Sequence, residues 1–154
     1  VPDSAGAGEY NGGPGGRVVT RARGNPTLAA GFGDGKVFPP KGVLGGESGS
    51  GNQGYILDSN NNRIEELPMV GIYEIKAGEA LEGIVAGGGG FGDPLNRDPE
   101  EVRKDVRKGW VTPNKALSTY GVVLDYGPEL FSVEIEATRE LRESKKKDKS
   151  ARQA

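Results

Sequence analysis

The sequence predicts an α+β protein, with a mostly antiparallel β core and Gly-rich loops followed by short C-terminal helices. Short runs that contain β-branched residues, separated by turn-forming residues, occur up to about residue 86. Beyond that point Asp or Thr precedes Pro where helices are expected to begin, and single glycines stand where they are expected to end. These two patterns favour one domain with a tail.

The composition indicates a thin hydrophobic core. Of 154 residues, 34% are hydrophobic and 27 are glycine, which has no side chain to bury. The chain has no Cys and no His, which excludes disulfides, thiol catalysis, zinc-thiolate sites and a histidine proton shuttle. A partner chain is therefore the expected source of further buried surface.

Charge and hydropathy indicate which partners and which cellular compartment to expect for the protein. A net charge of −2 argues against a general nucleic-acid binder. No apolar run approaches the ~20 residues that span a bilayer, and the first residues lack a leader pattern. We expect a cytoplasmic protein that binds neither nucleic acid nor a membrane.

The first third of the chain is predicted to be extended or irregular. Residues 1–16 form an extended entry segment, because Gly and Pro are too frequent for a helix. Runs 18–23 and 27–32 are predicted to form a hairpin-like pair across Gly24-Asn25-Pro26. Residues 33–54 are expected to be either a long structured loop or disordered, and a fixed conformation would need a surface to pack against.

Two further hairpins are predicted. One joins 55–57 to 63–67 through an Asn-rich turn, since Asn tolerates left-handed conformations. The turn shares the D-x-N-x-N spacing of a calcium loop but lacks its Gly and Glu, so the bare turn is favoured. The other joins 69–75 to 80–86, with alternate residues on opposite faces.

The remaining chain has helix signals. Asp98 caps a helix in which Glu101 completes a D-x-x-E box and which Gly109 ends, and a second helix runs from Thr112 to Gly121. The first helix carries the narrow stripe Val102, Val106 and Trp110. A short strand (122–125) and a helix from about 134 to 143 follow. The predicted units are an entry segment (1–16), a β-rich domain with two short capped helices (17–125), a C-terminal helix (126–143) and a disordered charged tail (144–154).

The stretch VAGGGGFGDP (85–94) matches the G-x-G-x-x-G expression of dinucleotide sites. Such a site needs a helix that starts within the glycines, whereas Asp93-Pro94 disfavours that continuation. We predict a close-packing bend toward the capped helix, against another backbone or a partner chain. A phosphate nest built from the same amides stays an alternative.

Other motifs favour plain structural readings. Gly35-Lys36 lacks the first Gly and the Ser or Thr of a P-loop. The serines among glycines have no His as a base, and the Glu65-Glu66 and Glu100-Glu101 pairs are predicted to be solvated or to serve a helix start. The lysine run 145–147 lacks aromatic neighbours and is predicted to be a solubilising tail.

Four spaced motifs resemble one known family. They are PDSAGAGEYNGGPGG (2–16), FPPKGVLGGESG (38–49), GGGGFGDPLNRDPEEVRKDVRKGWV (87–111) and YGVVLD (120–125). In this order they are similar to the C-terminal region of the hydantoinase B/oxoprolinase family, over about residues 2–142. Ala5, Lys41 and Phe91 depart mildly from the usual pattern. A short chain of this kind resembles the small beta subunit of acetophenone carboxylase.

The resemblance implies a part of an ATP-dependent, biotin-independent complex that joins a ketone and bicarbonate into a β-keto acid. ATP and a divalent metal (Mg or Mn) are expected in the whole complex, and no cofactor in this chain. The expected partners are larger hydantoinase A-like and B-like subunits. No catalytic or metal-binding residue is assigned here, and no cofactor-binding residue is known. The motif positions, expected to be structural or at an interface, are Asp3, Ser4, Gly12, Gly13, Pro39, Pro40, Gly87, Gly88, Gly89, Gly90, Phe91, Gly92, Asp93 and Pro94.

Two alternatives remain at this stage. The same residues suit a component of an ATP-dependent hydantoinase or oxoprolinase, which opens a ring by amide hydrolysis. A free-standing binding module is the other alternative, and a stable monomer with its own ligand would favour it.

Overall fold

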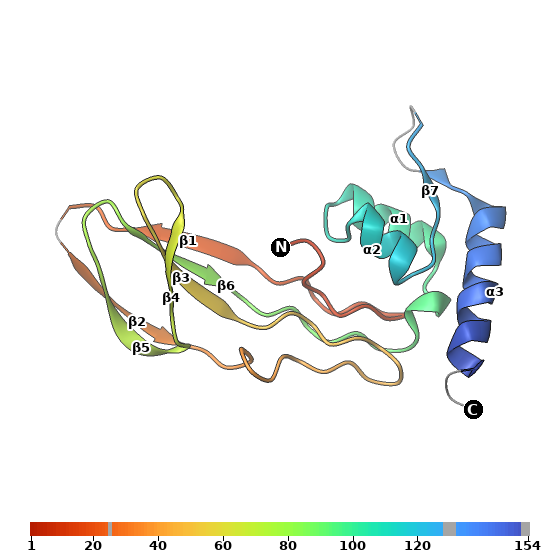
Figure 1. The fold of residues 1–154 in the computed structure, drawn as a ribbon, viewed down its shortest axis with the longest axis horizontal. Coiled ribbons are helices and arrows are strands. Elements are labelled where there is room, and N and C mark those ends of the chain that lie inside the picture. Colours follow the sequence, from red (N-terminus) through yellow and green to blue (C-terminus); the bar gives the residue numbers. More distant parts are fainter. Residues whose placement is uncertain (25, 128–131, 152–154) are drawn as a thin grey trace.

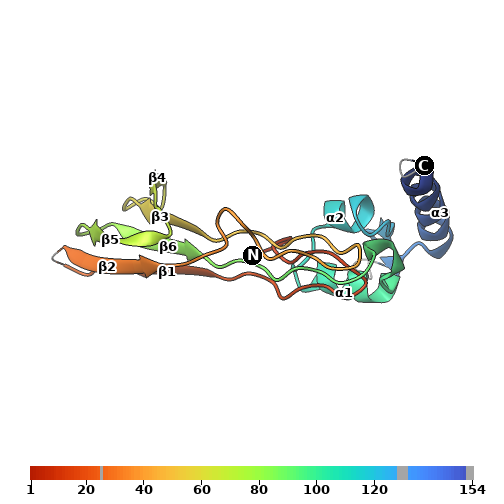
Figure 2. The ribbon, with the colours of Figure 1, turned by 90° about the horizontal axis from the view of Figure 1, so that it is seen from below.

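The structure, a computed structural model, describes residues 1–24, 26–127 and 132–151. The molecule is elongated, with the six longer strands at one end, the helices and a short two-stranded ladder at the other, and glycine-rich segments between them (Figure 1). Seen from below, the body is flat and the last helix stands across its end (Figure 2). The elements are β1 (Arg17–Arg21), β2 (Thr27–Phe32), β3 (Gln53–Leu57), β4 (Arg63–Glu66), β5 (Val70–Ile75), β6 (Ala80–Ile84), the 3₁₀ helix η1 (Pro94–Asn96), α1 (Pro99–Arg107), α2 (Pro113–Ser118), β7 (Leu124–Asp125), β8 (Ser132–Val133) and α3 (Ile135–Ala151).

The predicted α+β class is confirmed. A four-stranded antiparallel sheet has the order β1-β6-β3-β4, and two-stranded ladders join β2 to β5 and β7 to β8. The helices all follow the six long strands in the chain. The short strand expected within 122–125 is β7.

Two of the three predicted hairpins are wrong in their pairing. β1 pairs with β6 and β2 pairs with β5, so neither 18–23 with 27–32 nor 69–75 with 80–86 forms a hairpin. Instead, β1 and β2 together run antiparallel to β5 and β6 as one long ribbon. The ribbon bends where the amide of Ala22 donates to the carbonyl of Glu79 (3.2 Å). The turn residues therefore mark a bend of the ribbon. The β3–β4 hairpin is confirmed, and Asp58 Oδ1 holds its turn by accepting from the amides of Asn60 and Asn62 (both 2.8 Å).

The β part has its own core. The inner face of the β2–β5 ladder packs against the four-stranded sheet through Ile75, Ile56 and Leu67. The Tyr73 ring covers the paired glycines Gly31 and Gly71, where a Cβ on either would lie within 2.8 Å of the ring or its hydroxyl. Such a ring shields backbone that glycine would leave open.

The helical part has a second core, and its helix ends follow the sequence signals. Asp98 accepts a hydrogen bond from the amide of Glu100 (2.9 Å) at the start of α1, and Gly109 adopts φ +72° after its end. Val102 and Val106 are buried as expected, whereas Trp110 is half-exposed beneath the Lys108 ammonium. The second core consists of Ala7, Val102, Val106, Val111, Ala116, Tyr120, Val122 and Leu124. Glu101, expected to complete the capping box, pairs with Lys104 (2.6 Å).

The prediction of a disordered tail from residue 144 is wrong for residues 144–151, which continue α3. Basic side chains tie this helix to the body: Lys145 donates to the carbonyl of Ser118 (2.8 Å), and Lys149 pairs with Asp93 (2.6 Å). The lysines of the tail therefore hold the end of α3 against the rest of the molecule. Residues 152–154 of the predicted tail and 128–131 of the predicted 126–143 unit lie outside the described residues. Within the described residues, no helix combines the length and the apolar character that a membrane crossing requires.

Candidate functional site

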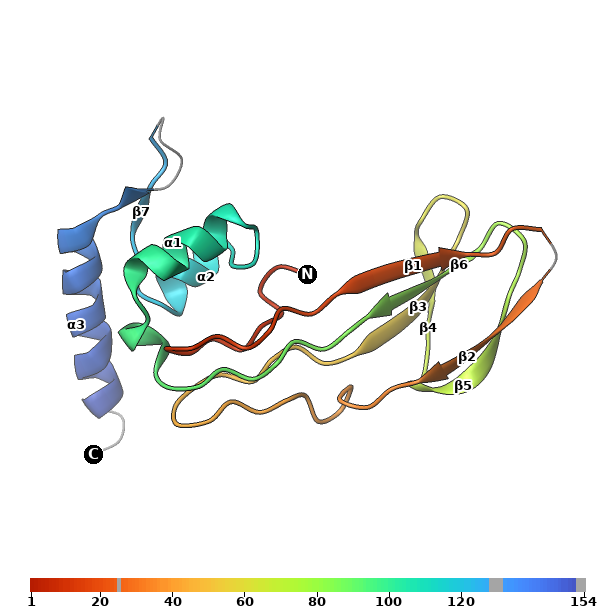
Figure 3. The same ribbon diagram turned by 180° about the vertical axis from the view of Figure 1, so that it is seen from behind.

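Three glycine-rich segments lie side by side between the sheets and the helices (Figure 3). We call residues 4–15, 40–50 and 86–92 the glycine bundle. Backbone hydrogen bonds join all three: Gly6 N donates to Gly88 O (2.8 Å), Gly90 N to Glu47 O (2.9 Å), and Glu47 N to Ala7 O (2.7 Å). Segments from three of the sequence motifs thus form one unit.

Glycine is required in the bundle because backbones touch there. A Cβ on Gly87 would lie 1.9 Å from the carbonyl oxygen of Ser4, one on Gly89 2.1 Å from that of Lys41, and one on Gly90 2.2 Å from that of Ala7. The same holds for Gly6, Gly12, Gly15, Gly42, Gly46 and Gly49, each with a carbonyl oxygen within 2.2 Å. Only a residue without a side chain permits such approach. Gly13 differs, since a Cβ there would have nothing within 4 Å.

The glycine run 87–90 of VAGGGGFGDP therefore packs closely against backbone, as expected, and the expected bend toward the helices comes just after the run, at Gly92 (φ +77°). Residues 86–90 continue from β6 toward the helices without a turn. Six of the seven amides of residues 86–92 are engaged: Ala86 N donates to Asn52 Oδ1 (2.5 Å), Gly88 N to Gly13 O (2.9 Å), and Gly92 N to Val43 O (2.9 Å). The amides of Gly87, Gly90 and Phe91 also have protein acceptors. The geometry argues against a nest, and η1 and α1 begin only after Asp93.

Asp3 and Ser4 anchor the first segment. Asp3, at φ 57°, accepts from the amide and the hydroxyl of Thr112 (2.8 and 2.6 Å), which caps α2. Ser4 is buried, and its Oγ accepts from the amide of Gly15 (2.8 Å). Lys115 donates to the carbonyls of Asp3 and Ala5 (3.2 and 3.3 Å). Asp3 therefore ties the first segment to α2, whereas Ser4 holds the two ends of that segment together.

The other motif positions line the edge of the bundle. Pro40 accepts the amide of Gly49 (2.9 Å), and Pro39 is half-buried beside it in sequence. The half-exposed ring of Phe91 lies 6.3 Å from that of Tyr10. Asp93 caps η1 ahead of buried Pro94. Burial alone would raise the pKa of Asp93, but the Lys149 ammonium and the Leu95 amide lower it overall.

A buried polar network joins the bundle to α1, and the sequence reasoning missed it. Arg97 pairs with Asp105 (2.9 Å), and Asp105 also accepts from Asn11 Nδ2 (3.1 Å). Asn11 Oδ1 in turn accepts from the hydroxyl of Tyr120 (2.8 Å), whose pKa burial raises strongly. The signal was the position of Asp105, three residues after Val102 on the buried face of α1. A cavity of about 250 Å³ adjoins this network.

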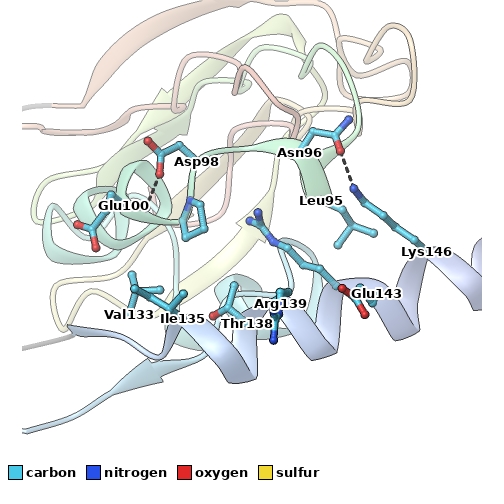
Figure 4. Close-up of a pocket in the computed structure, with 12 residues that line it drawn as sticks. Leu95, Asn96, Asp98, Glu100, Val133, Ile135, Thr138, Arg139, Glu143 and Lys146 are labelled. Atoms are coloured by element: carbon cyan, nitrogen blue, oxygen red, sulfur yellow. Dashed lines mark hydrogen bonds between the residues drawn. The ribbon is translucent and has the colours of Figure 1, made fainter.

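A wider cleft of about 640 Å³ separates α3 from the start of α1 (Figure 4). Leu95, Val133 and Ile135 give it an apolar floor, and charged side chains stand around them. Its cations already have partners: Lys146 donates to Asn96 (2.9 Å), and Arg139 pairs with Glu136 (2.5 Å). Across residues 1–24, 26–127 and 132–151, no group of three or more Asp or Glu is placed to hold a metal ion.

Comparison with known proteins gives relatives over most of the chain. The beta subunit of caprolactamase from Pseudomonas jessenii is 32% identical over 148 residues, which are 90% of this chain and 24% of that protein. The B component of a putative D-/L-hydantoinase from Pseudomonas sp. (strain NS671) is 34% identical over 110 residues, 71% of this chain and 18% of that protein. The delta subunit of acetophenone carboxylase from Aromatoleum aromaticum is 43% identical over 56 residues, 36% of this chain and 8% of that protein. This chain thus spans about a quarter or less of the length of these relatives.

Two solved structures have the same fold. The ATP-dependent caprolactamase from Pseudomonas jessenii matches with a TM-score of 0.76 and 31% identity, over 92% of this chain and 24% of that chain. The nucleotide-free structure of acetone carboxylase, determined for ATP-dependent acetone carboxylation, matches with a TM-score of 0.72 and 26% identity, over 97% of this chain and 24% of that chain. These relatives are subunits of ATP-dependent carboxylases, caprolactamase or hydantoinase. The family model of hydantoinase B/oxoprolinase matches residues 1–94, and the chain belongs to that family.

Proposed function

We propose that this chain is a structural, noncatalytic part of an ATP-dependent, biotin-independent complex of the hydantoinase B type. The observation that carries the proposal is the closed glycine bundle. Six of the seven amides of residues 86–92 donate to protein acceptors, and nine glycines of the bundle lie against backbone, so these groups hold the chain together. The motif positions act in this proposal by packing and not by touching a substrate.

For the reaction of the complex, we propose the carboxylation of a ketone with bicarbonate, which gives a β-keto acid. ATP and a divalent metal, Mg or Mn, act in the larger hydantoinase A-like and B-like subunits. The likeness of nearly the whole chain to acetone carboxylase and the shorter match to an acetophenone carboxylase subunit support this reaction. This chain contributes the scaffold that completes the larger subunit.

A second reaction has equal support. The caprolactamase relative matches over 148 residues and also shares the fold. In that case the complex uses ATP to open a cyclic amide by hydrolysis. The role of this chain is the same in both reactions, because the bundle and its anchors do not depend on the substrate.

The test is to isolate the native complex through a tag on this chain and to measure its ATP hydrolysis. Acetone or acetophenone with bicarbonate, and caprolactam or hydantoin without bicarbonate, are the substrates to compare. Ketone-stimulated hydrolysis that requires bicarbonate supports the carboxylase, and stimulation by a cyclic amide supports the hydrolase. Avidin, which sequesters biotin, is expected to leave either activity unchanged.

The isolated chain is the control for the noncatalytic role. It is expected to hydrolyse no ATP with any of these substrates. Turnover by the purified chain alone would refute the proposal, and so would a native complex that contains no larger subunit of this family.

A further inference from the structure

The outer face of the β2–β5 ladder is apolar and uncovered. Leu28 and Ala30 on β2 and Val70 and Ile72 on β5 point away from the core, since their neighbours Ala29, Tyr73 and Ile75 pack inward. The exposed fractions are 72% for Leu28, 65% for Val70 and 73% for Ile72. Ala30 lies directly opposite Ile72 in the ladder, so the four side chains form one patch.

This pattern is that of a strand pair buried on both faces. A ladder that ends at solvent alternates apolar and polar residues, whereas β2 and β5 carry apolar residues on both sides. Single exposed apolar residues are ordinary, but a contiguous group on paired strands marks a contact surface. Both strands also have one edge without a neighbour among the described residues.

The exposed area of the whole chain also indicates a surface that a partner covers. A compact monomer of 16.1 kDa exposes about 7,400 Å². This chain exposes 9342 Å², which is about 1,900 Å² more than that scaling gives. One side of a standard interface buries about 800 Å². The elongated form therefore leaves enough surface for a large partner.

The solved relatives show that the extended fold occurs together with much more polypeptide. The acetone carboxylase match covers 97% of this chain but 24% of that chain, at a TM-score of 0.72. The long form is thus kept in a protein about four times as long. A larger chain is therefore the expected partner for the exposed surface, because it offers a large contact area and leaves the elongated fold unchanged.

We propose that the outer face of β2–β5 docks an apolar surface of the larger hydantoinase B-like polypeptide of the complex. The inference rests on the proposed function. Glu74 lies directly opposite Leu28 at the end of the patch, so the docked surface presents Lys or Arg there. Leu28, Val70 and Ile72 fill the apolar centre, where burial contributes most of the binding energy.

The absence of Cys allows a direct test with single thiols. Ile72→Cys and Ile135→Cys are a matched pair, because both side chains are 73% exposed and Ile135 lies on α3 at the other end of the molecule. Each variant is prepared as the isolated chain and as the native complex. The rate of maleimide labelling is measured, and a thiol-to-amine cross-linker identifies what lies next to each thiol.

In the isolated chain, both thiols are expected to react at similar rates. In the complex, the labelling rate of the thiol of Ile72→Cys is expected to fall by about tenfold or more. Its cross-links are expected to join it to the larger hydantoinase B-like polypeptide. The thiol of Ile135→Cys reports any change in labelling that does not come from the proposed surface. Ile72→Lys is expected to weaken retention of that polypeptide about tenfold.

The outcomes separate this inference from the proposed function. Unchanged labelling of Ile72→Cys in a complex that contains the larger polypeptide overturns the docking surface alone. Cross-links from Ile72→Cys to a second copy of this chain overturn the proposed occupant. A native preparation without any larger polypeptide of the family overturns both proposals.

Discussion

The glycine bundle and the β2–β5 ladder solve the problem of a thin core in opposite ways. In the bundle, backbones touch and bond to one another directly, so side chains are not needed to fill space. The ladder depends on side chains, and four of its seven described apolar side chains face outward. The bundle is therefore complete within this chain, whereas the ladder is built as the inner layer of something larger.

The sharpest way to break the bundle is to add one methyl group. In Gly12→Ala the new Cβ would lie 2.0 Å from the carbonyl oxygen of Gly88. Because backbone cannot rotate away as a side chain can, we expect a loss of about 4 kcal/mol or more in the free energy of unfolding. Urea denaturation of the isolated chain measures it.

Gly13→Ala is the matched control, one residue along the same segment. Nothing lies within 4 Å of a Cβ at Gly13. The alanine also restricts the unfolded chain, so stability is expected to stay the same or rise by about 0.5 kcal/mol. Equal effects of the two substitutions would mean that the bundle is held by something other than close backbone contact.

The link between the bundle and α1 is expected to give the next largest effect. Asp105→Asn removes the charge that pairs with Arg97 and keeps the size of the side chain. The guanidinium is then buried without a counter-charge, and we expect a loss of about 3 kcal/mol in the free energy of unfolding. The control is Glu101→Gln on the same helix, whose pair with Lys104 is exposed and is expected to matter little.

The sequence predicts what local chemistry decides and misses what distant segments decide. Asp98, Gly109 and Thr112 mark helix ends correctly because capping involves only a few neighbouring residues. The pairing of β1 with β6 was missed because a hairpin and a folded ribbon carry the same turn residues. Glycine spacing correctly predicted close backbone approach, although not which carbonyl each glycine meets.

The tail and the buried network were missed for a related reason. A lysine-rich segment without an apolar face looks solvated, but Lys145 and Lys149 bind groups that are distant in the sequence. Arg97, Asp105 and Asn11 come together only when the first segment reaches α1. Their roles depend on tertiary contacts that the fold creates.

In the four-stranded sheet, lowering the pH is expected to protonate the buried carboxylate of Glu82 and so to destabilise the fold. Glu82 is buried between Arg17 and Arg63, and the hydrogen bond from Arg63 lowers its pKa despite desolvation. A lowered pKa in the folded state stabilises the fold above the unfolded value of about 4.3, and this stabilisation is lost as the pH falls through the folded value.

Stability measured from pH 7 to pH 3 tests this assignment. We expect Glu82→Gln to cost about 2 kcal/mol at pH 7, because two charge-assisted hydrogen bonds weaken. The difference from the unmodified chain is expected to shrink below about pH 4.3. Glu65→Gln, on exposed β4, keeps the original pH profile. A pH profile that Glu82→Gln leaves unaltered would assign the acid sensitivity to another group.

The smallest effect is expected where the ladder faces outward. Val70→Thr keeps the β-branched shape of a side chain that is 65% exposed, and it is expected to change the stability of the isolated chain by less than about 0.5 kcal/mol. Ile75→Thr, on the same strand but buried against Ile56, is expected to cost about 2 kcal/mol, because it buries a hydroxyl in an apolar core. Urea denaturation compares the two. If Val70→Thr proves as costly as Ile75→Thr, the outer face already contributes to the isolated fold, and the contrast between a complete bundle and an open ladder fails. If Val70→Thr leaves the stability of the isolated chain unchanged, the stability of this chain alone does not explain the valine at this position. Contact with another surface is then the physical reason for it.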